Sequence, residues 1–399
     1  MDTTSQGQGL RAEFTGDGGQ FFRLALIGNL LQIPTFGFYR FWLTTDIRRH
    51  LWSHTRIGGE ALEYTGRGRE LLIGFLIAMA ILTPIYTAYF LLSIEAERWQ
   101  AFASVPLFFI IYGLMHFGSY RARRYRATRT VFRGVRLWMT GSGWAYAGRA
   151  MLWDMLTLVT LGLALPWRAA ALESYRMRHT HFGDVQGKFT SSGWEFFKRG
   201  SWLWFLTIAS PIFIPGAFLF FYGLESLGVS TAKTSSIIIA ALIPMALILT
   251  YPLFRAIEMR WWLDGIRIGG MSMTSDLSKL SVLWAYGKAM LIVGIATSVG
   301  AIIFQVALDS LGFSFEDLGQ GGMPPIPLIA LIVGFYILAL IGMAVIFQQF
   351  VTRGLWQLAT ESLTVFNLEA LDDAAARGGA ASGVGEGLAD ALDFGGGGL

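Results

Sequence analysis

Long apolar stretches alternate with short, arginine-rich segments along the chain. Six of the apolar stretches are about 20 residues long, which lets a helix cross about 30 Å of hydrocarbon. They cover residues 71–92, 101–118, 201–223, 236–254, 282–306 and 326–350. The pattern predicts an all-α polytopic membrane protein with six transmembrane helices.

Two further apolar stretches, 21–39 and 148–166, are shorter in effect because polar residues interrupt them. Asn29 and Gln32 lie in the first and Asp154 lies in the second. Either segment can cross the membrane, giving eight spans if both do, or re-enter and leave by the same face. We favour the re-entrant alternative, because a crossing at 148–166 would export a net-positive loop.

The polar segments between the apolar stretches are basic and resemble one another. They are residues 40–69, 119–149, 168–200 and 255–281, with a fainter fifth copy at 350–371. Residues 54–59 read HTRIGG, 179–183 read HTHFG and 267–270 read RIGG. Short basic loops stay in the cytoplasm, so we expect four to five internal repeats whose loops are all cytoplasmic.

The two ends of the chain differ from this membrane domain, which covers residues 21–371. Residues 1–20 are polar and lack the ordered features of a secretory signal. Residues 372–399 are acidic, small and glycine-rich, with too little apolar surface to fold alone. The composition predicts a disordered cytoplasmic tail.

Composition and missing motifs exclude several functions. The chain is 54% hydrophobic and 15% charged, with a net charge of +4, whereas soluble domains have about 25% charged residues. It has no cysteine, which excludes disulfides and thiolate chemistry. We find no phosphate-binding loop, dinucleotide fingerprint or nucleophile elbow. We therefore expect no enzyme activity, no cofactor and no nucleic-acid partner, and membrane lipids as the partners of the basic loops.

Arginines in the basic loops are the main candidate site. A guanidinium binds phosphate through a planar fork, and basic segments beside a membrane attract anionic lipid. The candidates for a lipid phosphate or another anionic ligand are Arg48, Arg49, Arg56, Arg123, Arg124, Arg176, Arg178 and Arg267. The simpler alternative is that these side chains only anchor helix ends at the head groups.

Asp154 is the acid deepest inside an apolar stretch, and Asn29 takes the equivalent place in the other interrupted segment. A carboxylate in lipid is costly unless it is paired, protonated or exposed to water. A structural ion pair with Arg149, about one turn earlier, is one explanation. An intramembrane polar site of a secondary transporter is the other.

Histidines offer weak metal candidates. They are His50, His54, His179 and His181. The first two have the i, i+4 spacing of zinc ligands on a helix, and Asp46 or Asp184 would have to complete the site. The second and fourth basic loops lack the matching histidine, so we expect hydrogen-bonded interfacial histidines and no metal.

Residues 14–69 resemble the signature of the YjgN family of bacterial inner-membrane proteins, a domain of unknown function. The shared features are F-T-G-x-G, T-x-G-x-Y-R-x-W and T-R-I-G-G-x-x-L-E-Y-x-G. Chain length and repeat architecture are also similar, to about residue 370. The resemblance implies a location in the inner membrane and a membrane protein partner such as a metalloprotease. It carries over no site residues.

Two functions remain after these exclusions. The favoured one is a non-enzymatic component whose arginine-rich cytoplasmic face binds anionic lipid head groups or a protein partner. The alternative is a secondary transporter with its site near Asp154 and the short interrupted segments. An intramembrane enzyme that combines the histidine pair with Asp154 has the least support.

Overall fold

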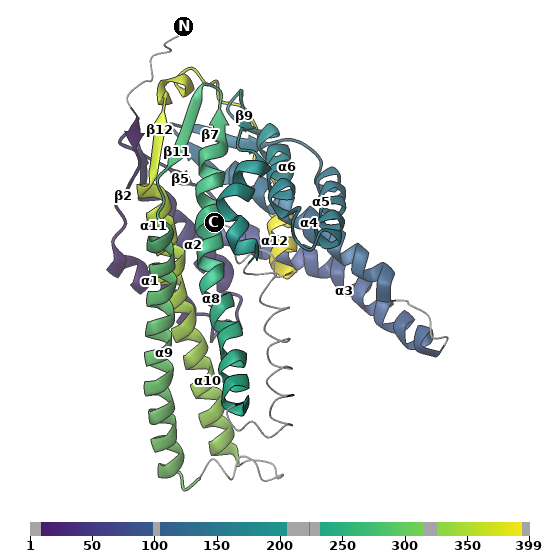
Figure 1. The fold of residues 1–399 in the computed structure, drawn as a ribbon, viewed down its shortest axis with the longest axis vertical. Coiled ribbons are helices and arrows are strands. Elements are labelled where there is room, and N and C mark those ends of the chain that lie inside the picture. Colours follow the sequence, from purple (N-terminus) through teal and green to yellow (C-terminus); the bar gives the residue numbers. More distant parts are fainter. Residues whose placement is uncertain (1–8, 99–103, 206–222, 224–231, 314–324, 393–399) are drawn as a thin grey trace.

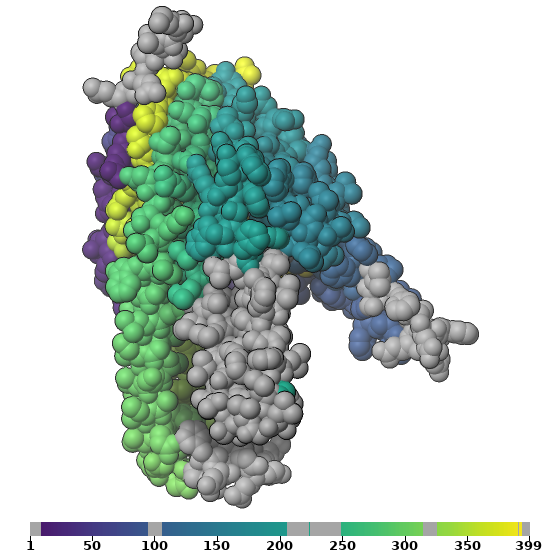
Figure 2. Space-filling model, viewed as in Figure 1, coloured from purple at the N-terminus to yellow at the C-terminus, as the bar shows by residue number. Residues whose placement is uncertain are grey.

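The computed structural model describes residues 9–98, 104–205, 223, 232–313 and 325–392. Strands gather at one end of the molecule, and long helices leave that end in two directions (Figure 1). One group holds α8 (Ala232–Gly265), α9 (Lys279–Ser310) and α10 (Ile326–Phe347). The other is the pair α3 (Gly68–Arg98) and α4 (Ser104–Arg129). In space-filling view, α9 forms one continuous side of the first group (Figure 2).

The strands are short, two to five residues each, and every pairing among the described residues is antiparallel. They are β1 (Leu10–Arg11), β2 (Glu13–Phe14), β3 (Thr55–Ile57), β4 (Glu60–Ala61), β5 (Glu63–Tyr64), β6 (Thr130–Phe132), β7 (Val135–Met139), β8 (Thr180–Phe182), β9 (Val185–Phe189), β10 (Ile266–Ile268), β11 (Met271–Ser275) and β12 (Leu363–Phe366). Nine of them form a sheet in the order β1-β12-β11-β10-β9-β8-β7-β6-β5, and β2-β3-β4 form a second sheet.

The two sheets join into a closed ring of strands. Only Ala12 separates β1 from β2, and only Leu62 separates β4 from β5. Both linking residues hydrogen-bond across the junction, Ala12 N to the Leu363 carbonyl and Leu62 N to the Thr55 carbonyl. A ring leaves few unpaired edge groups, which is how such short strands can be stable together.

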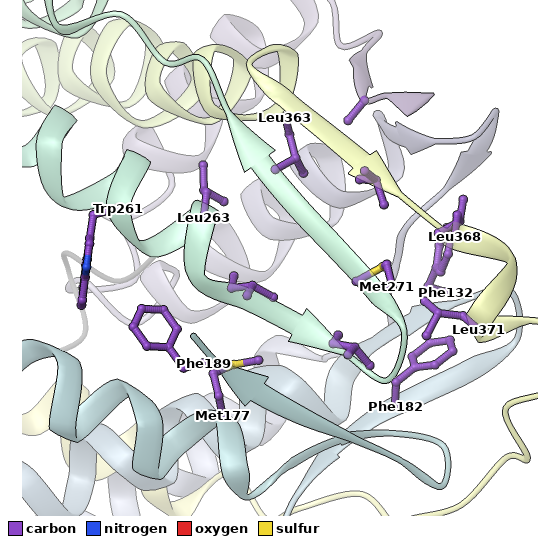
Figure 3. Close-up of a cluster of buried hydrophobic side chains, with 14 of the residues drawn as sticks. Phe132, Met177, Phe182, Phe189, Trp261, Leu263, Met271, Leu363, Leu368 and Leu371 are labelled. Carbon is purple, nitrogen blue, oxygen red and sulfur yellow. The ribbon is translucent and has the colours of Figure 1, made fainter. Parts of the chain in front are cut away.

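Apolar side chains of the ring form the largest buried cluster (Figure 3). Phe132 of β6, Phe182 of β8 and Phe189 of β9 contribute rings, and Trp261 of α8 packs edge-on against Phe189. Burying an aromatic side chain stabilises a fold by roughly 1.5–3 kcal/mol. This core therefore holds together strands that lie far apart in the sequence.

The basic loops form tight turns between consecutive strands. The turn between β6 and β7 places Arg133 at φ 50° and Gly134 at φ 73°, and that between β3 and β4 places Gly58 at φ 60° and Gly59 at φ 85°. Glycine occupies this left-handed region without strain. The turns reverse the chain where one helix ends and the next begins.

In the described part of the chain, the same contact recurs at four threonines, each of which directly follows a strand. The backbone N–H of each threonine donates to the carbonyl at the end of a helix, and its side chain lies within hydrogen-bonding distance of the same oxygen. The pairs are Thr15 with His54, Thr65 with Arg129, Thr140 with His179 and Thr190 with Gly265. Each contact satisfies a helix-terminal carbonyl and fixes the beginning of one helix against the end of another.

The two interrupted segments form short helical hairpins. The first consists of α1 (Gly18–Leu30) and α2 (Arg40–Ser53), and the second of α5 (Gly143–Val159) and α6 (Leu165–Arg178). Helices α1 and α5 have 13 and 17 residues. Each is therefore about 20–25 Å long, which is shorter than the hydrocarbon layer of about 30 Å.

The turns of the two hairpins have the same conformation. Phe36 and Gly37 have φ 49° and 84°, and Leu161 and Gly162 have φ 51° and 86°. Before each turn, a threonine hydroxyl donates to a carbonyl four residues earlier and accepts a backbone N–H four residues later. Phe36 is 93% exposed and Leu161 66% exposed, so both hairpin tips are apolar and uncovered.

The expectation of an all-α protein with six to eight spans is wrong. The ring of strands overturns the all-α class. Within the described residues, three helical stretches are long and apolar enough to cross a membrane: Gly68–Ile94, Lys279–Ser310 and Ile326–Glu361. Most of the expected span 201–223 lies outside the described residues.

The predicted tail covers residues 372–399, of which the structure describes residues 372–392. Residues Val384–Ala391 form helix α12, which packs along both α3 and α4 (Figure 1). Its glycines allow this contact, because a Cβ on Gly387 would lie 1.9 Å from the carbonyl carbon of Gly74. Glycine content, which suggested disorder, here permits close helix packing.

Candidate functional site

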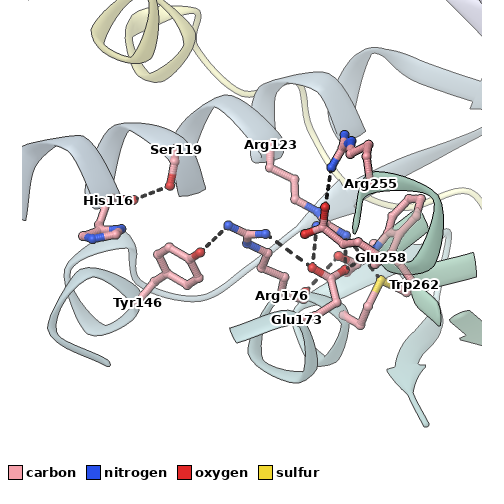
Figure 4. Close-up of polar contacts among 11 residues, drawn as sticks. His116, Ser119, Arg123, Tyr146, Glu173, Arg176, Arg255, Glu258 and Trp262 are labelled. Atoms are coloured by element: carbon pink, nitrogen blue, oxygen red, sulfur yellow. Dashed lines mark hydrogen bonds and ion pairs between the residues drawn. The ribbon is translucent and has the colours of Figure 1, made fainter. Parts of the chain in front are cut away.

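Several of the predicted arginines are held by buried acids. Arg123 of α4 forms a bidentate pair with Glu173 of α6, with nitrogen–oxygen distances of 2.7 and 2.5 Å (Figure 4). Arg176 also lies 3.4 Å from Glu173 and donates to the Tyr146 hydroxyl. The indole N–H of Trp262 donates to the same carboxylate at 2.8 Å. These arginines join α4, α5, α6 and α8.

The electrostatics of Glu173 are those of a structural ion pair. Its side chain is 5% exposed. Burial would raise its pKa, but Arg123 and Arg176 outweigh burial and hold the pKa below its ordinary value. Glu173 is therefore ionised at neutral pH, and its two arginines are occupied.

Arg48 is held in the same way by the tail. Its Nη2 lies 2.5 Å from Oε1 of Glu386 on α12, and its Nη1 donates to the Tyr64 hydroxyl at 3.3 Å. Arg126 of α4 also lies 3.5 Å from this carboxylate oxygen. Arg48 and Glu386 are buried, and Arg126 is mostly buried, with 19% of its side chain exposed. No local sequence pattern indicates this contact, because the partners are 338 residues apart.

The remaining predicted arginines are more available. Arg49 pairs with Asp46 at 3.0 Å but stays half exposed. Arg267 donates to three backbone carbonyls beside its own turn. Arg56 on β3 and Arg178 at the end of α6 are exposed, and Arg124 is half-buried with its Nε unpaired. The structure thus scatters the eight arginines instead of grouping them in one site.

Asp154 lies in a cluster between α4 and the second short hairpin. Its Oδ2 accepts from the Tyr112 hydroxyl at 2.8 Å and lies 2.9 Å from Nε2 of His116. Its Oδ1 accepts from Nε of Arg168. The expected partner Arg149 instead lies over the ring of Tyr175. The cluster is largely buried, since the side chains of Asp154 and His116 are 18% and 10% exposed.

Asn29 also joins its hairpin to a long helix. Its Nδ2 donates to the Gln348 side chain and to the Ala25 carbonyl, both at 2.8 Å, and its Oδ1 accepts from Gln32. Gln348 begins η2 (Gln348–Arg353), a π-helical turn between α10 and α11 (Gly354–Glu361). A π-turn rotates side chains relative to an α-helix, which brings Gln348 to Asn29.

The histidines form no recognisable metal site. Nδ1 of His54 lies 2.7 Å from the His50 carbonyl, and Nδ1 of His179 lies 2.8 Å from the Tyr175 carbonyl. His181 stacks on Trp138. Burial beside His54 and Arg353 lowers the pKa of His50 to about 4, so its ring is neutral at pH 7. Among the described residues, no three metal-ligating side chains lie together in a group that could hold a metal ion.

A groove that sequence reasoning missed runs between α1 and α2. Its volume is about 300 Å³. It is lined by Gln20, Arg23, Leu24, Ile27, Gly28, Tyr39, Leu43 and Asp46. Gly28 allows α1 and α2 to approach closely here, because a Cβ on Gly28 would lie 2.3 Å from Cδ1 of Leu43. Arg23 is exposed, and no described residue pairs with it. The groove is therefore charged at the base of the hairpin and apolar toward its tip.

Comparisons with known proteins identify a family. The family described as "Bacterial protein of unknown function (DUF898)" matches residues 9–391. The chain is also similar to "Inner membrane protein YjgN" of Salmonella typhimurium (strain LT2), with 24% identity over 148 residues. That match covers 37% of this chain and 34% of the relative, so it spans about a third of the relative's length. No solved structure matches. The chain is a membrane protein that belongs to the DUF898 family of bacterial proteins of unknown function.

Proposed function

We propose that the chain is a non-enzymatic, multi-pass component of the bacterial inner membrane whose arginine-rich cytoplasmic face binds anionic phospholipid. The relative's name supports the location. The observation that carries the binding proposal is the groove between α1 and α2, because the exposed Arg23, which has no partner among the described residues, lies beside apolar lining residues. The ring of strands and the tail lie on the cytoplasmic side in this proposal.

The groove suits one part of a lipid. Pockets for small molecules usually begin at about 300 Å³, so this one takes a single acyl chain and not a whole phospholipid. The acyl chain of the lipid would lie against Leu24, Ile27 and Leu43, and its phosphate would lie at Arg23. A guanidinium and a phosphate form paired, charge-assisted hydrogen bonds. Anchoring the head group at the base of the hairpin places its apolar tip in the acyl region.

The predicted arginines contribute unequally to this face. Arg123 and Arg176 are held by Glu173, so a phosphate could bind them only by displacing a buried carboxylate. Arg56 and Arg178 are exposed and carry charge without such a partner. We assign the specific contact to Arg23 and general attraction to the exposed arginines.

The test is lipid-induced stabilisation of the purified full chain in neutral detergent. Phosphatidylglycerol should raise the Tm of the wild type, and phosphatidylcholine should raise it less. Arg23→Gln removes the charge, and Leu24→Trp fills the groove while keeping the charge. Losing a charged hydrogen bond of 1.5–3 kcal/mol weakens binding about tenfold or more. Arg56→Gln, an exposed arginine on β3, is the matched control. Equal stabilisation of wild type and Arg23→Gln would refute the groove as the site.

A specific observation favours a second candidate, the secondary transporter. Asp154 is the meeting point of Tyr112, His116 and Arg168, and such intramembrane polar clusters bind protons or ions in transporters. The cluster joins a short hairpin to a long helix, which is where a moving element would act. The test is proton- or ion-coupled uptake into vesicles reconstituted with the wild type or with Asp154→Asn.

A further inference from the structure

Helix α12 occupies a fitted place between α3 and α4. A Cβ on Gly385 would lie 2.1 Å from Cβ of Arg121, and one on Gly74 would lie 2.1 Å from the Gly383 carbonyl oxygen. Leu388 is buried in a cluster with Ala78 and Leu82. Because α3 and α4 contact each other little, α12 supplies most of the packing between them. Residues 372–383 link it to the ring of strands and are mostly exposed.

The polar part of this contact is an anion site. Glu386 of α12 enters it between Arg48 of α2 and Arg126 of α4, and the Tyr64 hydroxyl also contacts Arg48. We call Arg48, Arg126 and Tyr64 the receptor for Glu386, and all three come from outside the tail. If α12 left, the Glu386 carboxylate would reach water and the two arginines would lose this partner.

Glu386 satisfies this receptor incompletely. One carboxylate faces the two guanidinium groups of Arg48 and Arg126, and no second acid among the described residues pairs with either of them. Its Oε2 is buried and accepts no hydrogen bond from the described residues. Burial lowers the pKa of Arg126 more than Glu386 raises it, whereas the pKa of Arg48 is raised despite burial. A phosphate group has more acceptor oxygens and can carry two charges, which suits a pair of arginines better.

We propose that Arg48 and Arg126 form a phosphate-binding site, and that α12 is a detachable internal ligand whose Glu386 competes for it. A tethered ligand acts at high local concentration, so a weak contact suffices to hold it in the absence of phosphate. Phosphate at the site releases α12 from α3 and α4. This inference rests on the proposed function, because it adds a regulatory site to the same lipid-binding face.

The absence of native cysteine allows a direct test in the full chain. Leu388→Cys places a thiol on α12 that is buried while α12 is docked against α3 and α4. Ser382→Cys places a thiol that is exposed whether α12 is docked or released. The measurement is the rate of maleimide labelling in detergent. Adding Glu386→Gln to Leu388→Cys should increase the rate about tenfold or more, since a charged hydrogen bond is lost. The Ser382→Cys rate should not change.

Phosphate is then added to Leu388→Cys that retains Glu386. Phosphatidic acid, whose phosphate can carry two charges, and inorganic phosphate are the two sources. Phosphatidylcholine, whose phosphate is balanced by a cationic group, is the net-neutral control. Acceleration by both phosphatidic acid and inorganic phosphate shows a general phosphate site, and acceleration by phosphatidic acid alone assigns it to a lipid head group. An unchanged rate in Glu386→Gln, or no acceleration by either source, would overturn the inference. Because Arg23 is intact in these proteins, failure here leaves the result at the groove unaffected.

Discussion

Arginine pairing decides which positive charges of this protein are available to a ligand. Glu173 holds Arg123 and Arg176, and Glu386 holds Arg48. Removing one partner of a buried pair leaves a charge with no compensation, which costs far more than an exposed pair contributes. Arg123 and Arg176 therefore serve the fold first, whereas the acid that holds Arg48 belongs to the tail helix α12.

Glu173→Gln tests this conclusion. It leaves Arg123 and Arg176 buried without a carboxylate, so we expect about 3–5 kcal/mol loss of stability and a lower Tm. Glu60→Gln is the control, because Glu60 pairs with Arg133 at the surface with its side chain half exposed, and should cost less than about 1 kcal/mol. Thermal unfolding of both variants makes the comparison. Similar losses would show that Glu173 does not carry the buried network.

Loop charge could be predicted from the sequence, but its pairing could not. Counting basic and acidic residues within a loop ignores acids in other segments. Glu173 lies 50 residues from Arg123, and Glu386 lies 338 residues from Arg48. Arg23 was overlooked because it lies within an apolar segment. The role that we propose for Arg23 depends on a groove that only the folded hairpin forms.

At the scale of elements, a polar residue joins each short hairpin to a long helix. Asn29 connects α1 with Gln348, and Asp154 connects α5 with Tyr112 and His116 of α4. The two residues are equivalent in the hairpins, but only Asp154 can carry charge. The second hairpin therefore contacts its long helix through a charged group, whereas the first does so through neutral amides.

Asp154→Asn separates the two proposed functions. The amide keeps the size of the side chain but removes the charge that faces Arg168. A transporter would lose proton- or ion-coupled uptake into reconstituted vesicles, whereas lipid-induced stabilisation would continue. Asn29→Asp is a useful counterpart, because it introduces a charge at the equivalent place. Full uptake by Asp154→Asn would eliminate Asp154 as a transport residue.

The hairpins and the strands differ in how far sequence predicts them. Interrupting polar residues, basic loop charge and Gly37 or Gly162 point to a chain that turns back. Strands of two to five residues give no alternation long enough to recognise. Their stability comes from pairing between segments up to about 350 residues apart, such as β1 with β12. Local pattern cannot report such pairing, and the all-α prediction failed for that reason.

At the scale of the whole molecule, a ring of strands gathers the ends of the helices at one end of the protein. The long helices extend away from it, and the short hairpins expose Phe36 and Leu161. We propose that the ring lies in the cytoplasm and that the hairpin tips lie in the inner half of the bilayer. Anionic head groups then lie at the level of Arg23.

Single-cysteine labelling of cells expressing the full chain tests this placement most directly. The positions are Phe36 at a hairpin tip, Lys188 on β9 of the ring and Ser310 at the far end of α9, all replaced singly by cysteine. A membrane-impermeant maleimide should label Ser310→Cys in intact cells and Lys188→Cys only after permeabilisation. It should label Phe36→Cys slowly in both conditions, because lipid covers that tip. Rapid labelling of Phe36→Cys in intact cells would mean that the hairpin crosses the membrane. That result would contradict the placement of its tip in the inner half of the bilayer.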